Sequence, residues 1–247
     1  MSSTYAPVDH PGVTVPAERR AWSTPWPHYR PVDITPPRLR PEALANPSDW
    51  VRDPQSDPAQ IKDWDQRLER AVVPYRLDSA GRPLNPTGRT GRCGRNLKSW
   101  GENAAADPIV IAGSGADRSV LLIRRGDNGL WAIPGGMVDP GETVEVALVR
   151  ELGEETGVDL TGRAPDAILR RGYVRDWRNS DHAWVASTAA LFLLPETVPA
   201  QGADDALEAR WVPFTSVDRL VDDLAPHGGL YGAHLPLLTT AVNHLRF

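Results

Sequence analysis

The sequence predicts an α/β protein in which an α/β/α sandwich with a mixed sheet follows a smaller, proline-rich N-terminal domain. After residue 107, segments with strand character alternate with segments of helical periodicity, an order that suits helices on both faces of one sheet. Before residue 100 the chain carries 15 of its 24 prolines and little periodicity, as extended or irregular segments do. We therefore predict a proline-rich domain over residues 1–104 and an α/β domain over residues 105–247.

One helix is predicted in the proline-rich part. Asp57 has the position of an N-cap, Pro58 that of the first helical residue, and Gln60 completes the capping pattern. Apolar residues then recur at helical spacing, namely Ile61, Trp64, Leu68 and Ala71 or Val72. The three tryptophans before residue 51 argue against disorder in the remainder, because disordered segments contain few aromatic residues.

The second part contains five segments rich in β-branched and aliphatic residues, which predict strands. They cover residues 109–112, 120–124, 168–174, 189–194 and 208–213. Helices are predicted near residues 143–156, 215–224 and 235–244, where the apolar residues follow a helical period. The alternation of these elements is the basis for the predicted sandwich.

Residues 130–136 indicate the end of a strand that runs into the glycine pair Gly135–Gly136, where the backbone can approach a ligand closely. A Pro-Gly turn at residues 140–141 follows. The helical pattern then begins, with an apolar stripe at four-residue spacing formed by Val144, Leu148 and Leu152. Gly157 ends the helix, as glycine after a last turn commonly does.

Glu151, Glu154 and Glu155 stand at positions i, i+3 and i+4 of this helix, so three carboxylates share one face. A solvated acidic face with Arg150 paired to Glu154 is the alternative interpretation. The adjacent glycine pair and the spaced Glu142 favour a metal site instead. Mg²⁺ prefers carboxylate oxygens and bridges to phosphates, with Mn²⁺ as an alternative ion. Arg150 would then hold a glutamate in position.

The stretch from Gly136 to Val158 resembles the signature of the Nudix hydrolases at every position. Gly136 is followed after five residues by Glu142 and after seven more by the run Arg-Glu-Leu-Gly-Glu-Glu-Thr-Gly-Val at 150–158. The resemblance implies a metal-dependent enzyme that cleaves a nucleoside diphosphate linked to another group. It also implies that Glu151, Glu154 and Glu155 bind the metal and that Arg150 takes part in catalysis.

The wider sequence resembles one branch of this family, the ADP-ribose pyrophosphatases of mitochondrial type and the related domain of melastatin-type channels. Matching blocks lie at residues 81–91, 100–108, 172–184, 204–211 and 230–234. The resemblance implies that six residues hold the nucleotide sugar, namely Asn85, Asp107, Asp176, Arg178, Leu230 and His234. Two alternatives stay open: Arg178 can pair with Asp176 or Asp181, and His234 can cap or pack on a helix.

The resemblance leads us to expect an ADP-ribose diphosphatase that releases AMP and ribose 5-phosphate. One alternative is a Nudix hydrolase of NADH or a diadenosine polyphosphate, and another is an ADP-ribose sensor without hydrolysis. The sequence does not identify the general base. The candidates are a glutamate of the helix or one of Asp204, Asp205 and Glu208.

Composition excludes several other classes. The net charge of −5 and the absence of a basic patch argue against a nucleic-acid partner. No apolar run approaches the roughly 20 residues that span a membrane, and the N-terminus lacks a signal-peptide hydrophobic region, so we expect a cytoplasmic protein without a membrane partner. The single cysteine, Cys93, excludes an intrachain disulfide. The oligomeric state is open, and a monomer is compatible with the sequence.

Overall fold

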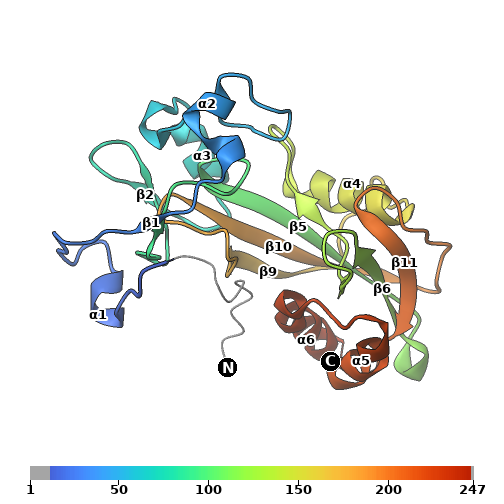
Figure 1. Ribbon diagram of the computed structural model, residues 1–247. Helices are drawn as coiled ribbons and strands as arrows, with labels where there is room; N and C mark the ends of the chain where they lie inside the picture. The colour runs from blue at the N-terminus through green and yellow to red at the C-terminus, as the bar shows by residue number, and fades with distance from the viewer. Residues whose placement is uncertain (1–11, 246–247) are drawn as a thin grey trace. The chain divides into compact units, whose positions relative to one another are not determined.

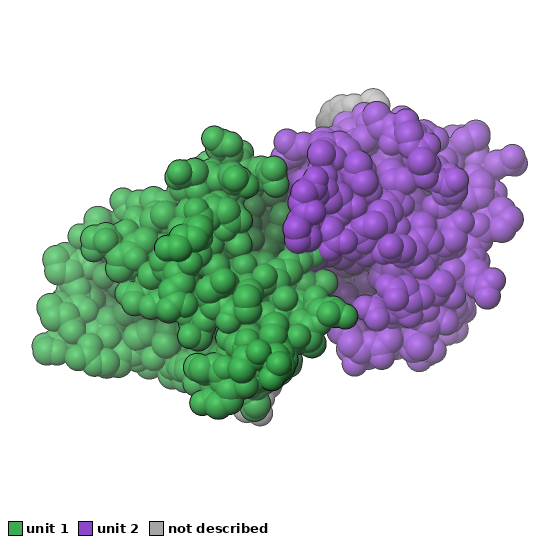
Figure 2. Space-filling model, turned by 90° about the horizontal axis from the view of Figure 1, so that it is seen from above, with its two compact units in different colours: residues 1–104, 172–186 green, residues 105–171, 187–247 purple. Residues whose placement is uncertain are grey.

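The computed structural model describes residues 12–245. The first 11 residues of the predicted N-terminal domain, which include Pro7 and Pro11, and the last two residues of the predicted second domain lie outside this range. The chain divides into two compact units (Figure 2). Unit 1 contains residues up to 104 together with 172–186, and unit 2 contains residues 105–171 and those from 187 onward. Residues 172–186, which we predicted as part of the second domain, therefore group with the first unit.

Unit 1 is built from short elements. Its helical segments are α1 (Ala17–Arg20), η1 (Pro37–Leu39), α2 (Pro41–Leu44), η2 (Pro58–Gln60) and α3 (Trp64–Arg70). Its strands are β1 (Val32–Asp33), β2 (Arg76–Leu77), β3 (Pro83–Leu84) and β4 (Arg92–Cys93). β1 pairs with β4 in parallel, and β2 pairs with β3 antiparallel. Frequent prolines keep these elements short, because proline lacks the N–H that continues a helix or a ladder.

The helix predicted after Asp57 is interrupted. Asp57 does cap a turn, and its side chain accepts a hydrogen bond from the N–H of Ala59 at 3.0 Å. The chain turns extended at Ile61, with φ −69° and ψ 137°, and a separate helix, α3, begins at Trp64. The break lets the indole of Trp64 donate to the carbonyl of Pro58 at 3.2 Å, while Ile61 and Trp64 are both buried.

Arg89 holds residues 19–24, which precede β1, by hydrogen bonds to their backbone. Its guanidinium donates to the carbonyl oxygens of Arg19, Ala21 and Thr24 at 2.7 to 2.9 Å. It also lies over the ring of Trp22, 5.1 Å from the ring centroid. A single cation thus satisfies three carbonyls of an irregular segment that makes few ladder hydrogen bonds of its own.

The main sheet has seven strands in the order β11-β6-β5-β10-β9, with β7 paired to β6 and β8 paired to β5 (Figure 1). Its strands are β5 (Gly101–Ala112), β6 (Ser119–Arg125), β7 (Trp131–Ala132), β8 (Gly136–Met137), β9 (Ala167–Val174), β10 (Ala183–Leu194) and β11 (Ala206–Pro213). The helical elements of unit 2 are η3 (Gly115–Asp117), α4 (Val144–Thr156), α5 (Val217–Leu224), η4 (Ala225–His227), η5 (Gly232–His234) and α6 (Leu235–His244).

The sheet is mixed, as predicted. β6 pairs antiparallel with both β5 and β11. β5 and β10 run parallel, since Gly101 donates to His182 at one end and Gly113 donates to Leu194 at the other. Of the helices formed by residues 12–245, none combines the length and the apolar character needed to cross a bilayer.

Two hydrophobic clusters cover the two faces of the sheet. One contains Ile109 and Ile111 of β5 with side chains of α5 and α6, and the other contains Val110 and Ala112 with Leu148 and Leu152 of α4. Figure 1 shows α4 in yellow on one side of the sheet and α5 and α6 in red on the other. The alternation along β5 thus supplies both cores, and the predicted α/β/α sandwich is confirmed.

Candidate active site

The glycine pair predicted to allow close approach does so on two sides. A Cβ atom added to Gly135, whose φ is 147°, would lie 2.4 Å from the carbonyl oxygen of Ala106. A Cβ atom added to Gly136 would lie 2.5 Å from the carboxylate of Glu151. Gly135 is therefore required by its φ and by the backbone of β5, whereas a side chain at Gly136 would displace the carboxylate of Glu151.

Helix α4 begins and ends as the sequence predicts. The hydroxyl of Thr143 accepts a hydrogen bond from the N–H of Val146 at 3.4 Å, and Gly157 ends the helix with φ 70°. The fully buried Leu148 and Leu152 anchor one side of it. This packing fixes the rotation of the helix and so decides how deeply each of its glutamates lies.

The three predicted metal ligands differ in exposure. The side chain of Glu154 is 47% exposed and that of Glu151 is 12% exposed, whereas Glu155 is buried. Glu155 accepts a hydrogen bond from the N–H of Gly135 at 2.7 Å. The exposure of the three carboxylates thus decreases from Glu154 at the surface, through Glu151, to Glu155 beside the glycine loop.

Arg150 connects the acidic side chains. It contacts both carboxylate oxygens of Glu142 at 2.8 and 2.9 Å, Glu151 at 2.9 Å and Glu154 at 2.8 Å. Its guanidinium also donates to the carbonyl of Met137 at 3.1 Å. One planar cation can bridge several carboxylates because its donors form a fixed fork. The pair of Arg150 with Glu154, which we named as the alternative to a metal site, is therefore part of a larger cluster.

Burial raises the pKa of Glu155 to about 8, and the negative charge of Glu151 adds to this effect. The hydrogen bond from Gly135 acts in the opposite direction. A buried carboxylate next to another one is a costly arrangement in the absence of a nearby cation. This environment suits a group whose charge is compensated by a bound ion.

The donor set fits a hard divalent cation. Among the described residues, no three acidic, histidine or cysteine side chains form a ready-made metal cage. Mg²⁺ does not require one, since it keeps several waters and binds through one or two carboxylates and the phosphates of its substrate. Glu151, Glu154 and Glu155 would hold the ion beside the glycine loop, and this assignment stays a prediction.

Three of the six predicted sugar-binding residues lie in unit 2. Asp107 of β5 accepts a hydrogen bond from the hydroxyl of Ser187. Leu230 forms a parallel bridge with Trp131. His234 accepts through Nδ1 from the N–H of Ile133 at 2.9 Å. The ring of His234 also lies edge-on to that of Tyr231, with 5.1 Å between the centroids.

The other three residues lie in unit 1 and are held by protein contacts. The side chain of Asn85 donates to Ser180 and Tyr173 and accepts from the N–H and hydroxyl of Thr87. Arg178 pairs with Asp176 at 2.6 and 2.8 Å, the structural alternative that we left open. Asn85 is fully buried, so its visible role is to fix the backbone around it.

Arg125, at the end of β6, was not predicted from the sequence. It lies over the ring of Tyr231, 5.2 Å from the centroid, and it pairs with Asp127. Burial raises the pKa of Asp107 and Glu155, and the positive charge of Arg125 acts against this rise. Burial lowers the pKa of His234, and the charge of Arg125 adds to that effect. The only sequence signal was a pair of arginines before a glycine, which does not reveal tertiary neighbours.

The three loop candidates for the general base have different surroundings in the structure. Glu208 is paired with Arg210 at 2.6 Å. Asp204 has an unusual φ of 51°, a left-handed conformation that aspartate tolerates better than most residues. The charge of Asp205 contributes to the raised pKa of Glu155. Asp205 is therefore the candidate with a visible electrostatic link to the carboxylate cluster.

We expect His234 to make the protein sensitive to acid. Burial lowers its pKa to about 3, with a further contribution from Arg125. The unfolded chain then binds more protons than the folded one between pH 6.5 and pH 3, so this stability is complete above pH 6.5 and is lost as the pH falls. From about pH 7.5 to about pH 5 the loss amounts to about 2 kcal/mol.

Urea unfolding of wild type and His234→Asn at both pH values measures this effect. Asparagine can keep an acceptor for the N–H of Ile133 but does not titrate, so the variant should lose less stability in acid. His227→Asn at an exposed position is the control and should behave as wild type. Equal acid losses in all three proteins would exclude His234 as the source.

Two family models match the two parts of the chain. A model described as the NUDIX domain matches residues 103–231, and one described as the NUDT9-like N-terminal domain matches residues 15–101. A Caenorhabditis elegans relative named as nudix hydrolase 6 is 37% identical over 230 residues, which are 84% of this chain and 85% of that protein.

Two further relatives differ in length. A rat protein named ADP-ribose pyrophosphatase, mitochondrial, is 33% identical over 81% of this chain and 67% of its own length. A Nematostella vectensis transient receptor potential cation channel, subfamily M member-like 2, is 35% identical over 77% of this chain but only 14% of the channel. These matches and the arrangement around α4 agree: the chain is a member of the Nudix hydrolase family that carries a NUDT9-like N-terminal domain.

Proposed function

We propose that the chain is a Mg²⁺-dependent ADP-ribose diphosphatase that converts ADP-ribose and water into AMP and ribose 5-phosphate. The observation that carries the proposal is the carboxylate cluster of α4, connected by Arg150 and seated against Gly135 and Gly136. The choice of substrate is supported by the NUDT9-like N-terminal match and by the name of the rat relative.

The chain's own residues would prepare the reaction in three ways. Arg150 orients Glu151 and Glu154, and the N–H of Gly135 fixes Glu155. Bound Mg²⁺ would supply charge neutralisation for the diphosphate and a more acidic water. Asp205 is our proposed general base, because its charge reaches Glu155 while Glu208 is engaged with Arg210.

Product analysis tests the proposal. ADP-ribose, NADH and a diadenosine polyphosphate are incubated separately with the protein, with and without Mg²⁺. Metal-dependent formation of AMP and ribose 5-phosphate, with ADP-ribose strongly preferred, is the expected result. Preference for one of the other dinucleotides would assign the chain to a different Nudix substrate class.

A non-hydrolysing ADP-ribose sensor is the second candidate, and the similarity to the Nematostella channel favours it. The intact cluster of Glu151, Glu154 and Glu155 argues against it, since binding alone does not require three carboxylates facing an anionic ligand. Calorimetric binding of ADP-ribose without any turnover would establish the sensor. Cytoplasmic location, a monomeric state, the preference for Mg²⁺ over Mn²⁺ and the six sugar-binding assignments stay predictions.

We expect Ser187→Ala to weaken substrate use without a large change in fold. The hydroxyl of Ser187 is the described hydrogen-bond donor to Asp107, while burial raises the pKa of Asp107 to about 6. Loss of this hydrogen bond to a charged group should remove about 1.5 to 3 kcal/mol of the interaction free energy that holds the Asp107 carboxylate in place. If Asp107 contacts the sugar, the loss should appear mainly as a higher KM for ADP-ribose.

Thr188→Val is the matched control for this substitution. Thr188 follows Ser187 on β10 and is also buried, but its hydroxyl has no partner among the described residues. Removing that hydroxyl should leave both KM and stability close to wild type. If the two variants shift KM equally, the effect belongs to strand packing and the assignment of Ser187 fails.

A further inference from the structure

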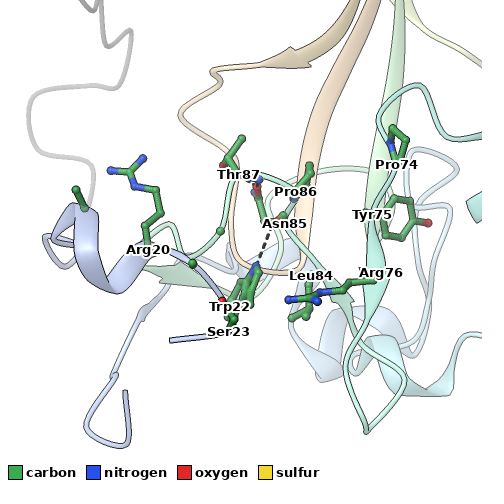
Figure 3. Close-up of a pocket in the computed structure, with 13 residues that line it drawn as sticks. Arg20, Trp22, Ser23, Pro74, Tyr75, Arg76, Leu84, Asn85, Pro86 and Thr87 are labelled. Atoms are coloured by element: carbon green, nitrogen blue, oxygen red, sulfur yellow. Dashed lines mark hydrogen bonds between the residues drawn. The ribbon is translucent and has the colours of Figure 1, made fainter. Parts of the chain in front are cut away.

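A cavity of about 570 Å³ within unit 1 does not form a site of its own. Parts of residues 17–23, 74–76 and 84–88 line it. Figure 3 shows the indole of Trp22 bonded to the carbonyl of Asn85, at 2.9 Å, with the side chain of Arg20 pointing away from them. Because Asn85 is one of the predicted sugar-binding residues, a ligand in this cavity would not reveal a second site. A different arrangement lies in unit 2, around Arg125.

Arg125, at the end of β6, has no part in the proposed hydrolysis, but direct contacts join it to the glycine loop. Its guanidinium lies over the ring of Tyr231, 5.2 Å from the centroid, and that ring lies edge-on to His234. Nδ1 of His234 accepts from the N–H of Ile133 at 2.9 Å, two residues before Gly135. Arg125 is thus the far end of a chain of contacts that begins at the loop beside the carboxylate cluster.

The charge of Arg125 acts on carboxylates that border this loop. It opposes the rise that burial causes in the pKa of Asp107 and of Glu155. The two other charges with the largest effects on Glu155 are negative. Arg150, the cation within the cluster, is already bound to three glutamates of its own. Arg125 is therefore better placed than Arg150 to meet an anionic ligand that approaches the loop.

Tyr231 fixes one side of the guanidinium. The N–H of Tyr231 donates to the carbonyl of Trp131 at 2.6 Å. Its side chain packs on the cluster formed by Ile123, Ala132 and Ala206. A guanidinium over an aromatic face keeps its N–H donors available in its own plane. The ring can therefore hold Arg125 in place while the partner of those donors changes.

The present partner of these donors is Asp127, in the turn that follows β6. Nε of Arg125 donates to Oδ1 of Asp127 at 2.9 Å, and Nη2 donates to Oδ2 at 2.8 Å. A phosphate can accept the same pair of parallel hydrogen bonds. The side chain of Asp127 is 61% exposed, and ion pairs at such positions contribute little to stability. Exchange of the carboxylate for a phosphate would therefore cost the fold little.

The turn does not depend on this ion pair. The N–H of Arg125 donates to the carbonyl of Leu130, and the N–H of Gly129 donates to the carbonyl of Arg125, both at 2.9 Å. The side chain of Asn128 accepts from the N–H of Leu130 at 3.0 Å. These bonds close the turn through its backbone. A purely structural role for the pair of Arg125 with Asp127 thus has little to support it.

We propose that Arg125 binds the diphosphate of the substrate and that Asp127 occupies the guanidinium until the substrate arrives. The inference rests on the proposed hydrolysis of a nucleoside diphosphate, to which it adds a binding residue and an internal competitor. The two partners of one ion pair then have opposite effects. Loss of the arginine weakens substrate binding, whereas loss of the aspartate strengthens it.

Steady-state kinetics of the full-length chain with ADP-ribose and Mg²⁺ test the proposal. Arg125→Gln should raise KM by at least about tenfold, the effect of one hydrogen bond to a charged group, with a smaller change in kcat. Arg125→Lys should recover part of the loss, because it keeps the charge but not the fork. Asp127→Asn should lower KM by about 2- to 5-fold, the range expected for release from an exposed ion pair.

Two matched controls separate this exchange from general charge effects. Arg124→Gln removes an exposed arginine from the neighbouring position of β6, whose side chain points to the other face of the strand and contacts Gly129. Asp223→Asn removes an aspartate from another exposed ion pair of unit 2, with Arg219. Both controls should keep the wild-type KM. Circular dichroism verifies that each variant is folded.

Three results would overturn the proposal. A wild-type KM in Arg125→Gln would exclude the arginine from binding. A rise in KM in both Arg125→Gln and Asp127→Asn would show that the pair is structural. Equal lowering of KM by Asp127→Asn and Asp223→Asn would assign the effect to net charge. In each case the wild type still hydrolyses ADP-ribose, whereas the absence of turnover in the wild type would contradict the proposed function itself.

Discussion

Glu155→Gln should lower Mg²⁺-dependent turnover of ADP-ribose by more than about 100-fold, because loss of a group that only supports a metal ligand already costs about 10- to 100-fold. Glu155 is buried against the glycine loop and accepts from the N–H of Gly135. Glutamine has the same shape and keeps an acceptor for that bond. The expected loss is therefore one of metal binding and not of fold.

The same substitution should leave the melting temperature unchanged or raise it. Burial raises the folded-state pKa of Glu155 to about 8 from its ordinary 4.5, so the folded chain binds more protons than the unfolded one between these values. Its contribution to stability is present at low pH and is lost as the pH rises through about 8. Replacement by a neutral amide removes this loss, and the gain in Tm should be larger at about pH 8 than at about pH 5.

Glu145→Gln is the matched control for Glu155→Gln. Glu145 stands on the same helix, but it is exposed and pairs with Arg171 at 3.3 Å outside the cluster. Its variant should keep wild-type kinetics and a wild-type metal dependence. Glu154→Gln should instead resemble Glu155→Gln in activity. Wild-type turnover in both cluster variants would refute the assignment of Glu154 and Glu155 as metal ligands.

The bounds of an element could be predicted from the sequence where its local pattern and its packing agree. Helix α4 has its N-cap, its apolar stripe and its terminal glycine, and the structure begins and ends it within a residue of the prediction. β5 was predicted to begin at Ile109 and begins at Gly101, because glycine, asparagine, alanine and proline have low strand propensity. Pairing with β10 supplies the hydrogen bonds that propensity does not predict.

The carboxylate cluster could be predicted because its members share one helix, where spacing determines proximity. Arg125 and Ser187 could not, because their neighbours come from distant strands and loops. The pair of Asp176 with Arg178 shows the opposite limit, since both residues were predicted to bind a sugar and the structure also joins them to each other. A residue type that suits a ligand also suits a protein partner, and spacing along the chain does not distinguish the two.

Arg150 is the residue whose loss should affect both stability and metal binding. It contacts Glu142, Glu151 and Glu154 with distances of 2.8 to 2.9 Å, and its side chain is only 26% exposed. Arg150→Ala leaves these carboxylates close together without a cation. In the absence of metal we expect the free energy of unfolding to fall by about 1.5 to 3 kcal/mol, the range for a hydrogen bond to a charged group. We expect the Mg²⁺ concentration for half-maximal turnover to rise by about 10- to 100-fold.

Titration of activity with Mg²⁺ and urea unfolding in EDTA measure the two effects of Arg150→Ala separately. Arg150→Lys should recover only part of each, because an ammonium group cannot bond both oxygens of Glu142 while it reaches Glu151. Arg171→Ala is the control, since it also removes an arginine paired with a glutamate of α4, but both partners are more than half exposed and such pairs contribute about 0 to 1 kcal/mol. If Arg150→Ala matched Arg171→Ala in both measurements, the cluster would be an ordinary surface ion-pair network. A selective loss in Arg150→Ala, partly restored by excess Mg²⁺, would instead link the arginine to the placement of metal-binding carboxylates.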